Sequence, residues 1–155
     1  EGVTTLDDEG RELAMFQVGR PMSVRVTFEA QREGAMPIVP TLAIYRADGI
    51  PVSRHRGESI ELDLHLGEQR QLQLDLGPLN LGDGRYVFSV GLFRRFDVSR
   101  IDEAQPYQII DRSYEFEVFG NPPNMAAVFQ HPGQWRLLQT GDVHDRSRHP
   151  DMSKP

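Results

Sequence analysis

Five histidines are the residues of this chain best suited to metal chemistry: His55, His65, His131, His144 and His149. Imidazole is the commonest transition-metal ligand in proteins, so each of them is a candidate ligand. No two of them are two or four residues apart, the spacings that bring two ligands to one face of a strand or helix. We therefore predict that the histidines are solvated surface residues and that the chain holds no metal.

Acidic side chains offer a second route to catalysis, because two carboxylates across a cleft can hydrolyse a glycosidic bond. The chain has 23 Asp and Glu residues, and many of them occupy the polar positions of alternating segments. The sequence contains no GxxxxGK[ST], GxGxxG, GxSxG or HExxH motif, which removes the usual nucleotide-binding and hydrolase signatures. We predict no catalytic residues, and a hydrolase that uses carboxylates stays open as an alternative.

Charge and cysteine content narrow the partners and cofactors. The net charge of −6 and the pI near 5.3 argue against nucleic-acid binding, which needs a basic surface to neutralise phosphates. The absence of cysteine excludes disulfides and thiolate metal sites. We expect no nucleic-acid partner and no cofactor.

Carbohydrate binding fits the residue pattern that remains. Proteins hold sugars with an aromatic side chain against the apolar face of the ring and polar groups on the hydroxyls. In an alternating strand, the neighbours of buried residues point to the opposite, solvated face. The predicted carbohydrate-binding residues share such an outward position or lie in the loop before residue 109: Arg25, Thr27, Glu29, Tyr45, Ser89, Phe93 and Tyr107.

Short strands must position these residues. Apolar residues alternate strictly over residues 22–30, and again over 60–66 and 72–76, which we interpret as an antiparallel hairpin around Gly67. In residues 79–93 a Gly-Asp-Gly turn leads into a buried strand, and residues 94–108 are predicted to form a long irregular loop. Roughly seven to nine such strands predict an all-β, immunoglobulin-like antiparallel β-sandwich.

The C-terminal part differs in composition. We predict one sandwich domain over residues 1–138, in which 126–138 form a further strand pair or a strand donated to a partner, and a disordered polar tail over 139–155. The sequence has no apolar run of about 18 residues and no signal-peptide pattern. Because the chain begins with Glu1 and not with Met, we expect it to be a piece of a longer protein.

A series of short motifs, in this order, resembles the C-terminal domain of Wzt, the ATPase subunit of ABC transporters that export bacterial O-antigen polysaccharide. The motifs are Asp8-Glu9-Gly10, Phe16-x-x-Gly19, Ile44-Tyr45-Arg46-Ala47-Asp48-Gly49, Leu81-x-x-Gly84-x-Tyr86, Phe116-Glu117-Val118 and a closing segment that ends in Trp135. One departure is Ala127, near which the family pattern has a glycine.

The resemblance implies a β-sandwich that is not itself an enzyme and binds the modified non-reducing end of O-antigen polysaccharide. It implies a homodimer formed by exchange of a C-terminal strand, with Val128, Phe129, Trp135 and Leu137 at the interface. It also implies an upstream ATPase domain, a transporter membrane subunit as partner, and a location at the cytoplasmic face of the bacterial inner membrane. A structural or protein-binding adaptor domain is the alternative.

Overall fold

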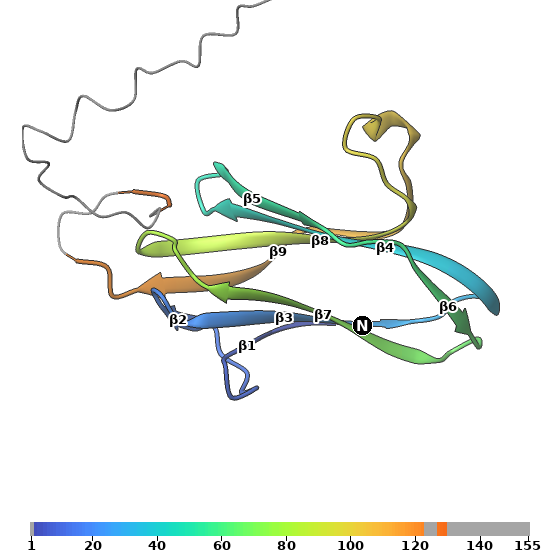
Figure 1. Cartoon of the computed structure of the whole chain (residues 1–155), viewed down its shortest axis with the longest axis horizontal. Helices are drawn as coiled ribbons and strands as arrows, with labels where there is room; N and C mark the ends of the chain where they lie inside the picture. Colours follow the sequence, from blue (N-terminus) through green and yellow to red (C-terminus); the bar gives the residue numbers. More distant parts are fainter. Residues whose placement is uncertain (1, 123–126, 130–155) are drawn as a thin grey trace, which may run out of the picture.

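The computed structural model describes residues 2–122 and 127–129, whose strands lie in two layers (Figure 1). The elements in chain order are β1 (Gly2–Leu6), β2 (Met15–Gln17), β3 (Pro21–Glu29), β4 (Gly34–Arg46), β5 (Pro51–Arg56), β6 (Ile60–Leu64), β7 (Gln69–Pro78), β8 (Gly84–Arg95), the 3-10 helix η1 (Ile101–Glu103) and β9 (Gln105–Phe119). Within these residues the fold is therefore all-β apart from one 3-10 turn.

The small sheet has the strand order β1-β3-β7, and the large sheet has the order β2-β9-β8-β4-β5. All neighbours pair antiparallel except β2 and β9, which pair parallel. The first residues of β4 pair with β6, which crosses from one layer toward the other at the right of Figure 1. The predicted antiparallel β-sandwich is confirmed.

The main core lies between the sheets and is built from the inward residues of alternating strands. Its centre is aromatic: the Tyr86 and Phe116 rings stack with centroids 5.4 Å apart, and Phe88 and Tyr114 stack at 5.5 Å. Phe16 meets Phe116 edge-on at 6.3 Å, which brings the short strand β2 into the same cluster. Strand β8 therefore supplies the central side chains of this core.

The turn before β8 has the structure that its glycines predict. Gly84 has φ of 141°, a conformation that side-chain-bearing residues rarely adopt. The hydroxyl of Tyr86 donates to the carbonyl of Gly82 at 2.8 Å, so this buried polar atom is satisfied. Asn121, just after β9, donates from its backbone N and its Nδ2 to Asp83 Oδ1 at 3.0 and 2.6 Å. These contacts join the start of β8 to the end of β9.

Two predictions, one about strand pairing and one about a loop, are wrong. The residues expected to form a hairpin do form strands, but β6 pairs with β4 and β7 pairs with β3. Alternating leucines place side chains on a face and do not select the neighbouring strand. The predicted long loop is also shorter, because β8 runs to Arg95 and β9 begins at Gln105. Backbone hydrogen bonding continues through these polar residues.

A cavity of about 260 Å³ lies between the two sheets, and His55 of β5 is one of its lining residues. His55 points inward because it pairs with Leu42 of the core, so the prediction that it is a solvated surface residue is wrong. Its Nε2 lies 2.8 Å from the Ser53 hydroxyl. The other lining residues include Val24, Leu74 and Val90. Burial in these surroundings lowers the pKa of His55, since the charged imidazole loses solvation.

Near the end of β8, the Phe93 ring lies against Gly91. A Cβ added at Gly91 would overlap Phe93 Cε2 and would lie 2.7 Å from Thr41 Oγ1. Phe93 itself is only 6% exposed and packs on Phe96, with ring centroids 4.6 Å apart. Gly91 is therefore required by the close approach of an aromatic ring.

We expect Gly91→Val to lower the free energy of unfolding by about 2 kcal/mol, because the new side chain forces the Phe93 ring and Thr41 out of place. Urea denaturation measures the change. Gly2→Ala is the control, since nothing lies within 4 Å of a Cβ at that position. If Gly91→Val lowers the free energy of unfolding equally in a Phe93→Ala background, the overlap with the Phe93 ring is not the cause.

His55 should make the stability of the fold depend on pH. Because the pKa of His55 is lowered in the folded protein, the unfolded chain binds a proton at this imidazole at a higher pH than the folded protein does. The free energy of unfolding should be retained above about pH 6.5 and decline as the pH falls through the folded-state pKa. Urea denaturation of His55→Gln across this range should show a weaker decline. His65→Gln is the control because that side chain is 78% exposed, and an equal effect of both variants would refute the role of His55.

Candidate functional site

The seven residues predicted to bind carbohydrate lie in three separate places, so they do not form one site. Arg25 and Thr27 lie on the outer face of the small sheet. Tyr45, Ser89 and Phe93 belong to the large sheet, on the opposite side of the sandwich. Glu29 and Tyr107 line a cavity at one end of the sandwich. The physical reason is that alternation separates inward from outward positions but does not say which sheet a strand joins.

On the outer face of the small sheet, polar side chains bond to one another across the strands. Arg25 Nε and Nη2 donate to Gln73 Oε1 at 3.3 and 3.0 Å. Thr27 Oγ1 accepts from Gln71 Nε2 at 3.2 Å. These pairs satisfy each other, as cross-strand neighbours in a solvated sheet face commonly do.

On the outer face of the large sheet, Tyr45 is covered on one side by an arginine. The guanidinium carbon of Arg112 lies 4.5 Å from the centre of the Tyr45 ring, a cation–π distance. Ser89 Oγ donates to Asp111 at 2.6 Å and accepts from the Arg112 backbone N at 3.0 Å. Arg112 has a φ of 46°, at an irregularity in the β8–β9 ladder that re-aims its side chain.

Phe93 points outward as its parity predicts, but its ring is not available to a sugar. The ring is buried over Gly91 and under Phe96, the first residue after β8. Strand alternation alone does not show that residues 96–104 return over this face. The aromatic ring that covers this part of the outer face is therefore Phe96, which is half-buried, and not Phe93.

The cavity at the end of the sandwich has a volume of about 600 Å³. Its floor is apolar and belongs to a second core cluster, with Phe28, Ile38, Leu64 and Leu92 among its buried residues. Its rim is polar or charged and comes from β3, the turn after it, and the facing ends of β8 and β9: Glu29, Gln31, Arg32, Arg94, Gln105, Tyr107 and Gln108. The cavity thus has a hydrophobic base with polar groups around it.

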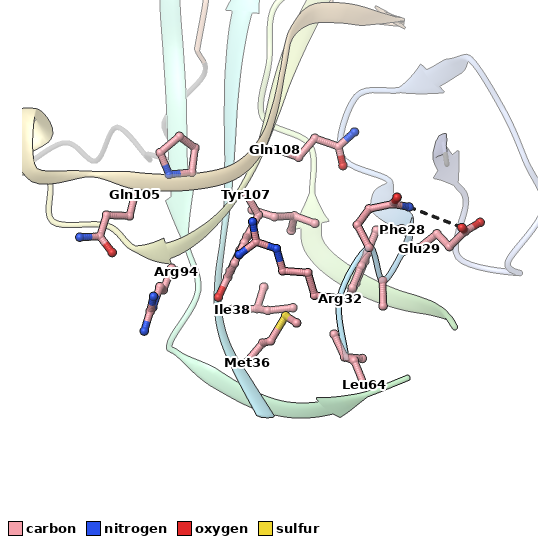
Figure 2. Close-up of a pocket in the computed structure, with 14 residues that line it drawn as sticks. Phe28, Glu29, Arg32, Met36, Ile38, Leu64, Arg94, Gln105, Tyr107 and Gln108 are labelled. Carbon is pink, nitrogen blue, oxygen red and sulfur yellow. Dashed lines mark hydrogen bonds between the residues drawn. The ribbon is translucent and has the colours of Figure 1, made fainter. Parts of the chain in front are cut away.

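The rim residues are spread across the lining of the cavity. Figure 2 shows Arg32 and Tyr107 in the middle of the lining set, with Phe28 and Glu29 on one side and Arg94 and Gln105 on the other. Tyr107 is 45% exposed, so its side chain is accessible from outside. The Glu29 carboxylate accepts a long 3.4 Å bond from Gln31 Nε2.

The charges of this rim leave two arginines for a ligand. Within the described part of the chain, neither Arg32 nor Arg94 has an acidic side chain within salt-bridge distance. Among the lining residues that the structure describes, Glu29 is the one carboxylate, whereas glycoside hydrolysis ordinarily uses two. Across residues 2–122 and 127–129, no group of three or more His, Cys, Asp or Glu side chains could hold a metal ion. The arrangement is suited to binding a polyhydroxylated ring.

Two of the four predicted dimer-interface residues fall in the part that the structure describes. The carbonyl of Val128 accepts from the Gly82 backbone N at 3.1 Å, and Phe129 forms an isolated antiparallel bridge with Leu81. Phe129 remains 54% exposed. Trp135 and Leu137, and the predicted tail over 139–155, lie outside the described residues. Within the described residues, no helix is long and apolar enough to cross a membrane.

A family model described as the Wzt C-terminal domain matches residues 1–130. A crystal structure of the C-terminal domain of Wzt matches with a TM-score of 0.73 at 14% sequence identity, covering 88% of this chain and 81% of that one. At this identity the likeness shows the fold. No curated protein sequence matches.

Two further solved structures match more weakly. A Pseudomonas fluorescens alkylpurine DNA glycosylase, AlkC, bound to DNA with an abasic site analogue, has a TM-score of 0.44 at 15% identity, covering 76% of this chain and 30% of that one. A β-glucosidase from Listeria innocua in complex with gluconolactone has a TM-score of 0.40 at 16% identity, with coverages of 77% and 16%. Neither supports a conclusion about this chain. Because the family model spans residues 1–130 of 155 and the fold agrees with it, the chain belongs to the Wzt C-terminal domain family.

Proposed function

We propose that this chain is a non-catalytic carbohydrate-binding domain that recognises the modified non-reducing end of an O-antigen polysaccharide. Membership of the Wzt C-terminal domain family is consistent with a carbohydrate-binding role and with ABC-transporter polysaccharide export. The observation that carries the proposal is the cavity at the end of the sandwich, which has an apolar floor and a rim of amides, arginines and one tyrosine.

The lining of this cavity matches the two-sided chemistry of a sugar. Its volume of about 600 Å³ lies within the range of about 300–1,000 Å³ that is typical of ligand pockets. The accessible Tyr107 ring offers an aromatic face for the C–H groups of a pyranose. Gln105 and Arg32 offer donors and acceptors for hydroxyl groups.

The apolar floor of the cavity supports recognition of a chain end. The buried side chains of Phe28, Leu64 and Leu92 belong to this floor and offer a surface for the terminal group of a glycan. A terminal sugar can enter such a site and the rest of the polymer can leave it. An end group can then be distinguished by what fits against the floor.

The remaining partners follow from the same proposal. The domain would act beside an upstream ATPase domain and a transporter membrane subunit, at the cytoplasmic face of the inner membrane. Its selection of finished polysaccharide would precede transport.

Calorimetric titration with O-polysaccharide purified from the strain that encodes this chain tests the site. We expect Tyr107→Ala to weaken binding about tenfold, because it removes a stacking surface for the sugar. Tyr45→Ala and Arg25→Ala are matched controls on the outer faces of the two sheets and should bind normally. Normal binding by Tyr107→Ala with loss in Tyr45→Ala would move the site to the outer face of the large sheet.

The same titration separates the competing functions. Polymer without its terminal modification should bind more weakly than the complete polymer. An adaptor domain would show no polysaccharide affinity, and a hydrolase would release reducing ends that Glu29→Gln abolishes. Equal affinity for both polymers would contradict recognition of the modified end.

We also propose that the chain forms a homodimer by exchanging its C-terminal segment. Support comes from the pairing of residues 127–129 along Leu81 and Gly82, which shows that this segment can add to the edge before β8. A Cβ at Gly82 would overlap the Ala127 carbonyl. This pairing therefore depends on a glycine.

We expect Gly82→Ala to shift the dimer toward monomer in sedimentation velocity, because the added methyl group separates the C-terminal segment from Leu81. Gly2→Ala should leave the sedimentation unchanged. A stable Gly82→Ala dimer would show that this contact does not belong to the exchanged segment.

A further inference from the structure

A second cavity, of about 560 Å³, lies at the other side of the end of β8. Its lining includes Val39 of β4, Arg56 of β5, and Arg94, Arg95 and Phe96 at the end of β8. The loop that follows, residues 96–104, stands above the large sheet at the upper right of Figure 1. This cavity therefore opens on the outer face of the large sheet, and none of the predicted binding residues lines it.

Arg94 connects the two cavities, because it lines both of them. Phe93 before it and Arg95 after it are outward positions of β8, whereas Arg94 faces the end cavity. A ligand seated in the end cavity can therefore extend past Arg94 into the second cavity.

The second cavity is cationic in a chain of net charge −6. Its three arginines face one acid, Asp97, which accepts bonds from the backbone N and Oγ of Ser99 at 2.9 and 2.7 Å. These bonds lower the pKa of Asp97, and the nearby charges of Arg56 and Arg95 lower it further. Even when Glu103, the partner of Arg95, is counted with Asp97, the three arginines outnumber the acids at this cavity, which favours an anion.

The arginines retain donors for a ligand. Arg56 uses Nε to hold the Phe96 carbonyl at 3.1 Å, and Arg95 Nη2 pairs with Glu103 Oε2 at 3.2 Å. A guanidinium has five N–H donors in a planar fork, so both side chains keep donors suited to the oxygens of phosphate, sulfate or carboxylate. The bond to Phe96 also holds Arg56 at the cavity.

The same cavity has an apolar wall. Phe96 packs on the buried Phe93 ring, and Val98 is 56% exposed beside it. An aromatic ring next to arginines can hold a sugar that bears an acidic group, with its carbon face on the ring and its anion on the guanidinium groups.

We propose that this arginine-lined cavity is a second subsite, which binds an anionic substituent on a glycan held in the end cavity. The inference rests on the proposed carbohydrate-binding function and adds the substrate class, an acidic glycan. Arg56 and Arg95 contact the anion, Phe96 contacts the sugar that carries it, and Arg94 lies between the two subsites.

The test compares native O-polysaccharide with three treated samples of it in calorimetric titrations. Hydrofluoric acid removes phosphate, solvolysis removes sulfate, and carbodiimide with borohydride converts carboxylates to alcohols. The treatment that removes the bound group should weaken binding about tenfold, as expected for loss of a charge-assisted bidentate contact. The affinity for the native polymer should also fall more steeply with added salt than the affinity for the polymer without its anionic group.

Variants of the second subsite locate the effect. Arg56→Gln and Arg95→Gln should each weaken binding of the native polymer by about fivefold to tenfold and leave binding of the neutralised polymer unchanged. Arg95→Lys should retain part of the affinity because it keeps the charge. Arg54→Gln is the matched control, since Arg54 is an exposed residue of the same strand as Arg56 and does not line the cavity.

The outcomes separate this inference from the proposed function. Equal binding of native and treated polymers overturns the anionic subsite but leaves the proposed carbohydrate binding intact. The same conclusion follows if the native polymer lacks acidic groups and its binding still depends on Tyr107. Unchanged affinity in both glutamine variants also overturns the anionic subsite. If no polymer binds at all, the proposed function fails together with the subsite.

Discussion

The structure depends on strand β8, which pairs over almost its whole length with β4 on one side and β9 on the other. Its inward side chains, Tyr86 and Phe88, are about 1% exposed and stack on Phe116 and Tyr114 of β9. A strand with two ladders and an aromatic core beneath it is fixed in register, because a slip of one residue would turn these rings outward. The fixed register of β8 also fixes the positions of the residues at its end, which line the two cavities.

The cavity at the end of the sandwich lies beside the first residues of β4, where that strand changes its pairing partner. Strand β4 begins in a pairing with β6 and joins β8 only from Val39 onward, so it passes from one partner to the other along its length. The side chains left between the sheets form the second core cluster, which becomes the floor of the end cavity. The binding site that we propose is thus the unfilled end of the hydrophobic core, ringed by polar residues from strand ends and turns.

Cationic side chains gather at this end although the whole chain is acidic. Arg32 and Arg94 lie at the rim of the end cavity, and Arg56 and Arg95 lie in the second cavity. Local concentration of positive charge in a negative molecule makes one region attractive to anions and discourages contact elsewhere. Such a distribution suits the function that we propose, the binding of one end of a long polymer.

Much of the fold could be predicted from the sequence, because alternation over β3, β7 and β8 records which side chains face a core, and Gly84 and Tyr86 mark how β8 begins. The sequence by itself therefore determined the strands, the sandwich class and Tyr107 and Glu29 as accessible polar positions. Only the tertiary structure decided that Arg25 and Tyr45 lie on opposite faces and that β6 pairs with β4. It also decided that Phe93 is covered and that Arg112 caps Tyr45. The physical reason is that side-chain parity is a local property of one strand, whereas the choice of partner strand, a ladder irregularity and the return of a loop depend on residues far away in the chain.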